Sequence, residues 1–290
     1  MDASSQGRPR TEPRTRLVAS APGSALSREA LLAGAQRSWL ARAIHCFEEL
    51  DSTNRLALEL AARGEPHGSA VIAEAQSAGR GRLGRSFHSP KGSNLYVSLV
   101  LRPRAPAAAL ATLPLAAGVA VAEAVAAELG HAARVALKWP NDVLVDGRKL
   151  SGLLLERVGA SAAGAVILGI GVNLNVDPAS FPAEFRERAT SLAAAAGRPI
   201  DRARFASALF DRLEGVLDLH DARGFEALRE RFEALFRMQG ARVRVADAAG
   251  SVREGCVVGV GADGSLRLAT ASGEERVFAG DVSVVKEPLP

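Results

Sequence analysis

The sequence predicts a mixed α+β protein that ends in a small all-β domain, and three observations indicate this architecture. Through residues 28–236, apolar runs with the two-residue period of β-strands alternate with helical patterns. After Gly240 the chain changes to short alternating strands separated by Ala-Gly, Asp-Gly and Ser-Gly turns. Hydrophobic residues make up 48% of the 290 residues but aromatic residues only 4%, so the core must consist mainly of Ala, Val and Leu.

The first elements follow a tail at residues 1–27, which is rich in Arg, Pro, Ser and Gly and is expected to be disordered. Ser27 is expected to begin a short helix, and the Asp51-Ser52-Thr53 cluster to cap a helix over Asn54–Arg63. Alternating residues predict three strands, the last of which follows a Gly/Arg loop: Ile44–Leu50, Ser69–Ala75 and Leu95–Leu101.

The middle of the chain continues the α+β pattern. An Ala-rich helix is predicted over Ala107–Leu129, broken or started near Pro114. Four further strands are predicted at Val135–Lys138, Val143–Val145, Lys149–Glu156 and Ala165–Ile170. The second and third of these form a hairpin, because the Asp146-Gly147 pair between them suits a type I′ turn. A helical region capped by Asp201 is predicted to run to about Phe236.

The last part of the chain, residues 237–290, is expected to be a separate small β-barrel of about 50 residues. Its five predicted strands are Arg242–Val245, Val252–Val260, Ser265–Ala269, Glu275–Phe278 and Val282–Val285.

The composition excludes several classes of protein. Two Cys exclude a disulfide framework and a multi-Cys zinc site, and the five His show no metal-binding spacing. The amino terminus lacks the apolar segment of a secretory signal, and the least charged stretch, Ala105–Ala122, is expected to be too short and too weakly apolar for a membrane span. We therefore expect a cytoplasmic protein that binds no membrane. A net charge of +4 is weak support for nucleic-acid binding.

The most informative segment is the loop Gly79–Phe87, which reads GRGRLGRSF. Three of its Gly fit the pattern GxGxxG, but a dinucleotide site also requires a helix directly afterwards and an acid about 20 residues later. Residues 89–122 contain no Asp or Glu. The loop also comes close to a P-loop, but Arg85 stands where that motif has Lys, and no helix opens there. Both motifs are therefore rejected.

Four cations and no acid lie within residues 79–91: Arg80, Arg82, Arg85 and Lys91. One interpretation is a solvated basic loop. The other is a loop that closes over an anion, because Arg forks suit phosphate oxygens and Gly lets the backbone approach a ligand. In that case a nucleoside triphosphate is a natural ligand and Phe87 offers a face for a base; otherwise Phe87 belongs to the core.

Further segments also have two interpretations. Lys138 ends an apolar strand, where it can meet a developing negative charge or lie on the surface. Asn141 and Asp142 can form a turn, or Asp142 can lie near Mg²⁺. The cluster at residues 51–54 can cap a helix or bind polar ligand atoms there. Gly152 lies in a strand, where Gly marks a close approach to the backbone.

Together and in this order, these segments resemble the biotin–protein ligases (biotin–[acetyl-CoA-carboxylase] ligases). The resemblance covers about residues 28–286, and its matching stretches read DSTN, AEAQSAGRGRLGRSFHSPKGSNLYVSL, LKWPNDVLVDGRKLSGLLLE and LGIGVNLNV. It implies a mixed-sheet catalytic domain of the biotin/lipoate ligase type over 28–236 and an SH3-like C-terminal domain over 237–290.

The resemblance also implies a reaction in two steps. ATP and biotin, with Mg²⁺, form biotinoyl-5′-adenylate, and a Lys of a biotin carboxyl carrier protein then attacks this mixed anhydride. Because the nucleophiles are the carboxylate of biotin and the acceptor Lys, the enzyme needs no catalytic Ser, Cys or His. Catalysis then consists of positioning and of electrostatic stabilisation at the α-phosphate.

Individual roles follow from the same resemblance. Lys138 and Arg82 would be the catalytic residues. The residues that would bind biotin are Ser52, Thr53, Asn54, Gln76, Arg80, Gly81, Arg82, Lys138 and Gly152. The residues that would bind ATP are Arg82, Arg85, Phe87, Asn141 and Asn173. No magnesium ligand is assigned, although Asp142 can lie near the ion.

The sequence departs from relatives at some points. Many relatives have Trp where Phe87 stands, which would make the platform for the base smaller. Some relatives carry an amino-terminal DNA-binding domain, but the 50 residues before Asp51 are expected to leave no room for one, so we expect no binding to nucleic acid. A homodimer through a sheet edge stays open. The alternative functions are a lipoate or octanoate ligase or transferase of the same superfamily, and a non-enzymatic biotin- or nucleic-acid-binding module.

Overall fold

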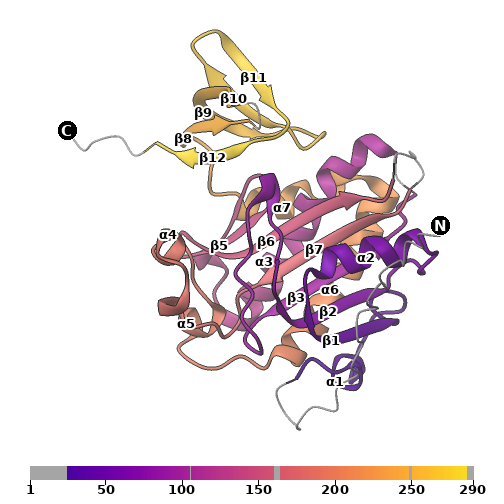
Figure 1. The fold of residues 1–290 in the computed structure, drawn as a ribbon. Coiled ribbons are helices and arrows are strands. Elements are labelled where there is room, and N and C mark those ends of the chain that lie inside the picture. Colours follow the sequence, from indigo (N-terminus) through magenta and orange to yellow (C-terminus); the bar gives the residue numbers. More distant parts are fainter. Residues whose placement is uncertain (1–24, 105, 160–163, 248–249, 286–290) are drawn as a thin grey trace, which may run out of the picture.

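Two β-sheets form the framework of the computed structural model, which describes residues 25–104, 106–159, 164–247 and 250–285 (Figure 1). One is a seven-stranded mixed sheet, and the other is a five-stranded antiparallel sheet near the carboxyl end. The predicted α+β class is therefore confirmed. The tail predicted for residues 1–27 lies outside the described residues except for 25–27.

The large sheet has the strand order β1-β2-β3-β7-β6-β5-β4. β1 and β2 are parallel, and all other neighbouring strands are antiparallel. Its strands are β1 (Ile44–Leu50), β2 (Ala70–Gln76), β3 (Leu95–Leu101), β4 (Val135–Lys138), β5 (Asp142–Val145), β6 (Arg148–Arg157) and β7 (Val166–Val172). Every strand predicted for this part is present. Asp146 and Gly147 both have positive φ, 49° and 73°, as the predicted type I′ hairpin turn requires.

Helices cover both faces of the large sheet (Figure 1). α2 (Thr53–Ala62) packs on one face, where Ala57 and Ala61 cluster with Val71 of β2. α3 (Leu113–Leu129) and α6 (Arg202–Arg223) pack against each other and against the opposite face. Ile72 belongs to that second core, since successive side chains of a strand point to opposite faces.

One helical stretch, Ala109–Leu129, is long and apolar enough to cross a membrane by length and composition. It combines the end of the 3₁₀ turn η2 (Ala107–Thr112) with α3, and Pro114 lies at the start of α3 as predicted. Our expectation that this region is too weakly apolar was therefore wrong. This helix is strongly apolar because it packs inside the fold, where 72% of its apolar window is buried. A helix that is covered on all sides is apolar on all sides.

The helical region predicted from Asp201 to Phe236 is not continuous. Asp201 caps α6 as predicted, with its side chain accepting from the Arg204 N–H. α6 ends at Gly224, whose φ of +71° few other residues adopt. The remaining helical elements are α1 (Arg28–Leu32), α4 (Ala183–Arg186), α5 (Leu192–Ala196) and α7 (Arg229–Leu235), with 3₁₀ turns η1 (Arg82–Gly84), η3 (Ala132–Arg134), η4 (Pro178–Ser180) and η5 (Phe225–Leu228). α4 and α5 were not predicted.

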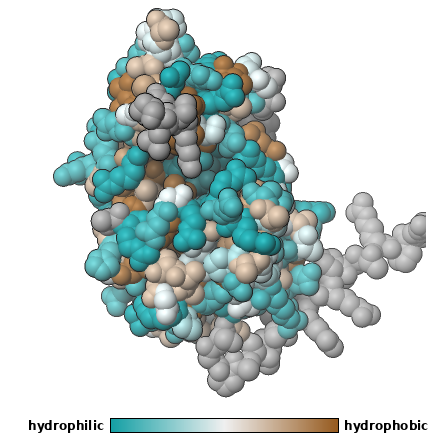
Figure 2. All heavy atoms as spheres, turned by 90° about the vertical axis from the view of Figure 1, so that its left-hand side faces the viewer, coloured by the Kyte–Doolittle hydropathy of each residue, from teal (hydrophilic) through white to brown (hydrophobic). Residues whose placement is uncertain are grey.

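The small sheet has the order β11-β10-β9-β8-β12. Its strands are β8 (Arg242–Ala246), β9 (Val252–Val260), β10 (Leu266–Thr270), β11 (Gly273–Val277) and β12 (Asp281–Val284), so all five predicted strands are present. Its buried side chains, such as Val243 and Leu266, belong to the same contiguous apolar core as the large sheet. Hydrophilic residues dominate the surface between the small sheet, at the top of Figure 2, and the larger part below.

Trp139 fixes the turn after β4 against the small sheet. Its side chain is only 2% exposed, and its Nε1–H donates to the carbonyl oxygen of Gly264 at 2.8 Å. Gly264 in turn packs closely on Thr112 and Leu115. The segment that carries Lys138 is therefore held between the two sheets.

We expect Trp139→Phe to destabilise the protein by about 1–3 kcal/mol, because it leaves the Gly264 carbonyl without its donor in a buried place. Chemical denaturation monitored by circular dichroism measures this change. Trp39→Phe is the matched control, because the Trp39 indole donates to Asp218 at an exposed position. A Trp139→Phe loss no larger than that of Trp39→Phe would contradict the role of Trp139 as a tie between the sheets.

Candidate active site

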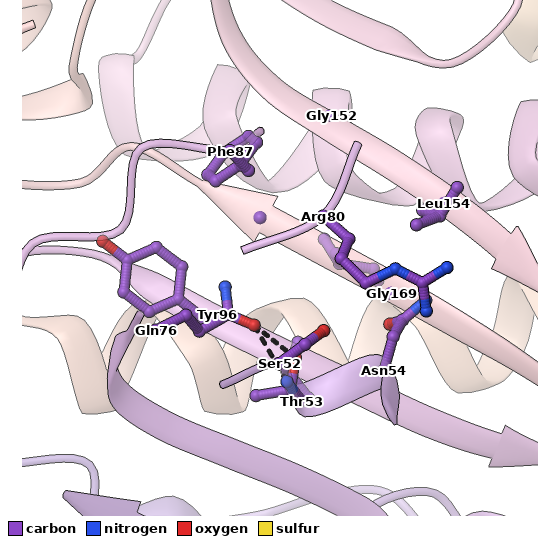
Figure 3. Close-up of a pocket in the computed structure, with 13 residues that line it drawn as sticks. Ser52, Thr53, Asn54, Gln76, Arg80, Phe87, Tyr96, Gly152, Leu154 and Gly169 are labelled. Atoms are coloured by element: carbon purple, nitrogen blue, oxygen red, sulfur yellow. Dashed lines mark hydrogen bonds between the residues drawn. The ribbon is translucent and has the colours of Figure 1, made fainter. Parts of the chain in front are cut away.

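Three strand glycines form a bare floor on the face of the large sheet that carries α2, and Figure 3 labels two of them, Gly152 and Gly169. Gly152 of β6 pairs with Gly171 of β7, and Gly169 lies further along β7. A Cβ atom at Gly169 would overlap with Asn54 Oδ1, and one at Gly171 would lie 2.6 Å from the Phe87 ring. Glycine in the middle of strands is thus required by what approaches the backbone here.

Polar side chains form a hydrogen-bonded network above this floor. Gln76 Oε1 accepts from the Thr53 N–H at 2.9 Å and from the Thr53 hydroxyl at 3.1 Å (Figure 3). The Ser98 hydroxyl lies 2.8 Å from Thr53 Oγ1 and 2.5 Å from Asn54 Oδ1. Asn54 Nδ2 donates to Glu156 at 2.8 Å. The network brings together three residues predicted to bind biotin and fixes the orientation of each.

Ser52 lines the same pocket without belonging to the network. It occupies the N-cap position of α2 and is 2% exposed, but its side chain makes no capping hydrogen bond. Within the described part of the chain, its hydroxyl has no hydrogen-bond partner. Because this residue lines the pocket and its hydroxyl does not cap the helix, the hydroxyl is available to a ligand at the helix N-terminus.

Arg80 and Phe87 of the basic loop line the pocket. Arg80 forms an ion pair with Glu156 at 2.8 Å and extends toward Asn54 (Figure 3). Phe87 packs on Gly171 and meets Tyr96 edge to face. The remaining cavity of about 30 Å³ is far smaller than the roughly 300–1,000 Å³ of small-molecule sites. A ligand therefore enters only when the loop side chains move.

One row of paired residues runs across five strands of the large sheet. Lys138 pairs with Asp142, Asp142 with Gly152, Gly152 with Gly171, and Gly171 with Tyr96. Residues paired directly across a sheet share one face. Since neighbouring strands lie about 4.8 Å apart, Lys138 is attached about 10 Å from the Gly152 floor, on the same side of the sheet.

Lys138 is the available cation of this row. Among the described residues, no side chain or backbone group forms a hydrogen bond or ion pair with its ammonium group. Next to it, the side chain of Asn141 donates to the Leu153 carbonyl at 2.6 Å and accepts from Arg82 at 3.3 Å. Burial lowers the pKa of Arg82, although Asp142 is close enough to oppose that effect. Asp281 is also close enough to act on both cations.

Asp142 is the residue predicted to lie near Mg²⁺, and its surroundings show whether the described residues form a magnesium site. Its carboxylate is bound by Lys149 at 2.6 Å. In the described ranges, no group of three or more His, Cys, Asp or Glu side chains is placed to hold a metal ion. A single, already paired carboxylate is a poor site for a resident ion. It is compatible with Mg²⁺ that arrives on nucleotide phosphates, because Mg²⁺ usually takes few protein ligands there.

Six predicted site residues do not line the pocket: Lys138, Asn141 and Arg82, described above, and Asn173, Gly81 and Arg85. Asn173 is 5% exposed, and its amide donates to the Thr190 carbonyl at 3.1 Å. Gly81 donates its N–H to the Arg85 carbonyl at 2.7 Å and thereby closes the loop turn. Arg85 pairs with Asp281 of β12. Their predicted contacts with biotin or ATP stay predictions, and so does the assignment of Phe87 to ATP, since Phe87 shares the pocket with the residues predicted for biotin.

Ser98, Tyr96 and Glu156 were not predicted as site residues from the sequence. Ser98 had a detectable signal, because it is the one polar, non-aromatic residue in the apolar strand LYVSLVL. Glu156 had none, since it is 102 residues from Asn54 in the sequence.

Comparison with known proteins identifies the family. The sequence profile of the Biotin/lipoate A/B protein ligase family matches residues 46–173. The biotin–[acetyl-CoA-carboxylase] ligase of Paracoccus denitrificans is 36% identical over 243 residues, which cover 80% of this chain and 96% of that protein. This chain belongs to the biotin–protein ligase family. The matched segment contains every residue assigned above to biotin or ATP, from Ser52 to Asn173.

Other members of the biotin–protein ligase family agree with this result. The biotin–[acetyl-CoA-carboxylase] ligase of Mycobacterium tuberculosis is 36% identical over 87% of this chain and 91% of its own length. The bifunctional ligase/repressor BirA of Bacillus subtilis is 35% identical over 81% of this chain and 72% of its own length. The biotin protein ligase of Aquifex aeolicus, solved in complex with biotin and ATP, superimposes with a TM-score of 0.72 at 29% identity, covering 85% of this chain and 100% of that one.

Proposed function

We propose that this protein catalyses the ATP-dependent ligation of biotin to a specific Lys of a biotin carboxyl carrier protein through biotinoyl-5′-adenylate. One observation carries the proposal. The residue row across the sheet places Lys138, which has no ion-pair partner among the described residues, on the same face as the polar pocket around Ser52, Thr53 and Gln76. The Aquifex aeolicus relative with biotin and ATP and a Leishmania major relative with biotinyl-5-AMP support the substrates.

In the first step, a carboxylate oxygen of biotin attacks the α-phosphorus of ATP and pyrophosphate leaves. The polar network around Thr53 and Asn54 offers both donors and acceptors for the ureido group of biotin. Lys138 supplies positive charge beside the carboxylate and the α-phosphate, where negative charge develops. Arg82 and Arg85 bind phosphate oxygens, with Asn141 orienting Arg82. Mg²⁺ accompanies the phosphates of ATP.

In the second step, the acceptor Lys amine attacks the carbonyl carbon of the mixed anhydride, AMP leaves with the bonding electrons, and the amine loses a proton. The loop residues Arg80 and Arg82 cover the adenylate between the two steps. An exposed mixed anhydride hydrolyses or reacts with other amines, and this cover keeps water and those amines away from it.

The same proposal includes the organisation of the chain. A catalytic domain over 28–236 and an SH3-like domain over 237–290 are supported by the five short antiparallel strands at the carboxyl end. We also propose a cytoplasmic, monofunctional enzyme that binds neither nucleic acid nor membranes. If it forms a homodimer, the edge strands β1 and β4 are where the large sheet can extend.

Incubation of the protein with ATP, Mg²⁺, biotin and a carrier domain tests the proposal. We expect the carrier Lys to gain the mass of biotin less water, with one pyrophosphate released per transfer. Lipoate and octanoate in place of biotin are the matched alternatives. Transfer of either of these but not of biotin would reject the proposal in favour of the other branch of the superfamily.

We expect Arg82→Gly to weaken retention of the adenylate, because the half-buried guanidinium bridges Asn141 and the Gly280 carbonyl across the site. Released adenylate would biotinylate lysines of a bystander protein such as serum albumin, by at least about tenfold over wild type if one charge-assisted contact is lost. Streptavidin blotting of the bystander measures this. Arg148→Gly, at an exposed hairpin position, is the control. Equal bystander labelling by wild type and Arg82→Gly would contradict the covering role.

A further inference from the structure

A carboxylate of the small sheet reaches the cations of the basic loop. Asp281, the first residue of β12, accepts from Arg85 Nη1 at 3.1 Å and from Arg85 Nη2 at 2.6 Å. The preceding Gly280 carbonyl accepts from Arg82 at 3.4 Å. The loop predicted to bind nucleotide phosphates is therefore held by a segment far along the chain, since Arg85 and Asp281 are 196 residues apart in the sequence.

Asp281 faces several cations. The hydrogen bonds from Arg85 hold the pKa of the Asp281 carboxyl below its usual value despite partial burial, and Lys138 and Arg82 are close enough to lower it further. These three cations are the ones assigned above to the phosphates and to the reacting carboxylate. The fork-like contact between Arg85 and the two Asp281 oxygens is also the geometry in which Arg binds phosphate.

We propose that Asp281 is an internal competitor of the nucleotide: its carboxylate occupies Arg85 in the ligand-free protein, and phosphate binding requires Arg85 to exchange Asp281 for a phosphate oxygen. The inference rests on the proposed function and adds a residue of the carboxyl-terminal sheet that sets the affinity for ATP. It assigns no contact between Asp281 and the substrates.

The exposure of the pair makes such an exchange feasible. The side chains of Arg85 and Asp281 are 57% and 44% exposed, so the ion pair is weak, and only a small free energy opposes its opening. A phosphate carries more negative charge than a carboxylate and can displace it. Removal of the Asp281 charge also removes a repulsion between that carboxylate and the incoming phosphates. Both effects act in the same direction, toward tighter binding of ATP.

The test is Asp281→Asn, which keeps the side-chain shape and removes the charge. We expect its dissociation constant for ATP to fall about twofold to fivefold, the range of an exposed ion pair, with the KM for biotin unchanged. Titration calorimetry with ATP and, separately, with inorganic pyrophosphate measures this, and the shift should shrink at high salt. The matched control is Glu274→Gln, because Glu274 forms a comparable two-oxygen pair with Arg267 on the same sheet, away from the loop.

Tighter binding of ATP and pyrophosphate by Asp281→Asn but not by Glu274→Gln supports the proposal. An unchanged or weaker affinity for ATP in Asp281→Asn overturns it, and would mean that Asp281 positions Arg85 for the nucleotide or has no influence on it. Asp281→Ser gives a second measurement if Asp281→Asn fails to fold. The carrier assay is independent: absence of biotin transfer by the wild type rejects the proposed function, whereas the ATP titrations still decide the competition.

Discussion

The Lys138→Ala variant is expected to fold normally and to lose synthesis of the biotinoyl adenylate by at least about a hundredfold. Lys138 supplies positive charge where the carboxylate of biotin meets the α-phosphate, and no other described residue pairs with its ammonium group. Its removal therefore leaves no buried partner behind, and the free energy of unfolding should change by less than about 0.5 kcal/mol. Pyrophosphate release without a carrier domain isolates this first step.

Lys91→Ala is the matched control for this experiment. Lys91 belongs to the same basic region, but its side chain is 62% exposed and forms only a long pair of 3.8 Å with Glu48. We expect its effect on pyrophosphate release to be less than about twofold. A folded Lys138→Ala protein that makes the adenylate at a rate near that of wild type would remove Lys138 from the mechanism.

The Gly169→Ala variant is expected to lose biotin binding and some stability together. A methyl group at this position overlaps with Asn54, which hydrogen bonds hold between Ser98 and Glu156. The side chain predicted to bind biotin must therefore move. We expect the KM for biotin to rise at least about tenfold, which is the effect of losing one strong hydrogen bond to the ligand. The free energy of unfolding should fall by about 1–3 kcal/mol.

Gly215→Ala controls for the general effect of adding a methyl group. Nothing lies within 4 Å of a Cβ atom built at Gly215, and the residue lies inside α6. This variant should keep the KM for biotin and gain about 0.5–1 kcal/mol of stability from its better helix propensity. A Gly169→Ala protein that binds biotin as tightly as wild type would show that Asn54 does not contact biotin.

Local patterns predicted the elements, whereas contacts between distant parts of the chain were not predictable from them. Strands such as Leu95–Leu101 and the hairpin at Asp146-Gly147 follow from periodicity and turn chemistry within a few residues. The break at Gly224 was missed, because the apolar pattern on its two sides is helical and only the backbone angle ends α6.

The candidate site was predictable to the extent that its motifs are local. The residues at 52–54 and Gln76 meet as the family resemblance implies. The partners of the basic loop were not predictable: Arg80 binds Glu156, and Arg85 binds Asp281. Each of these pairs depends on how strands far apart in the sequence lie in the sheets, and a carboxylate gives no sequence signal of its partner.

The small number of lysines, and the ion pairs that two of them form, limit how far the acyl adenylate can modify the protein that makes it. An escaped acyl adenylate modifies neutral amines, and this chain has only four Lys among its 36 basic residues: Lys91, Lys138, Lys149 and Lys286. Guanidinium groups stay protonated and do not compete. Lys91 and Lys149 form ion pairs with Glu48 and Asp142, and these pairs must open before either amine can reach an acyl adenylate. The surface of the molecule is therefore nearly inert toward self-labelling, and its few acceptor amines can be followed one by one by peptide mass spectrometry.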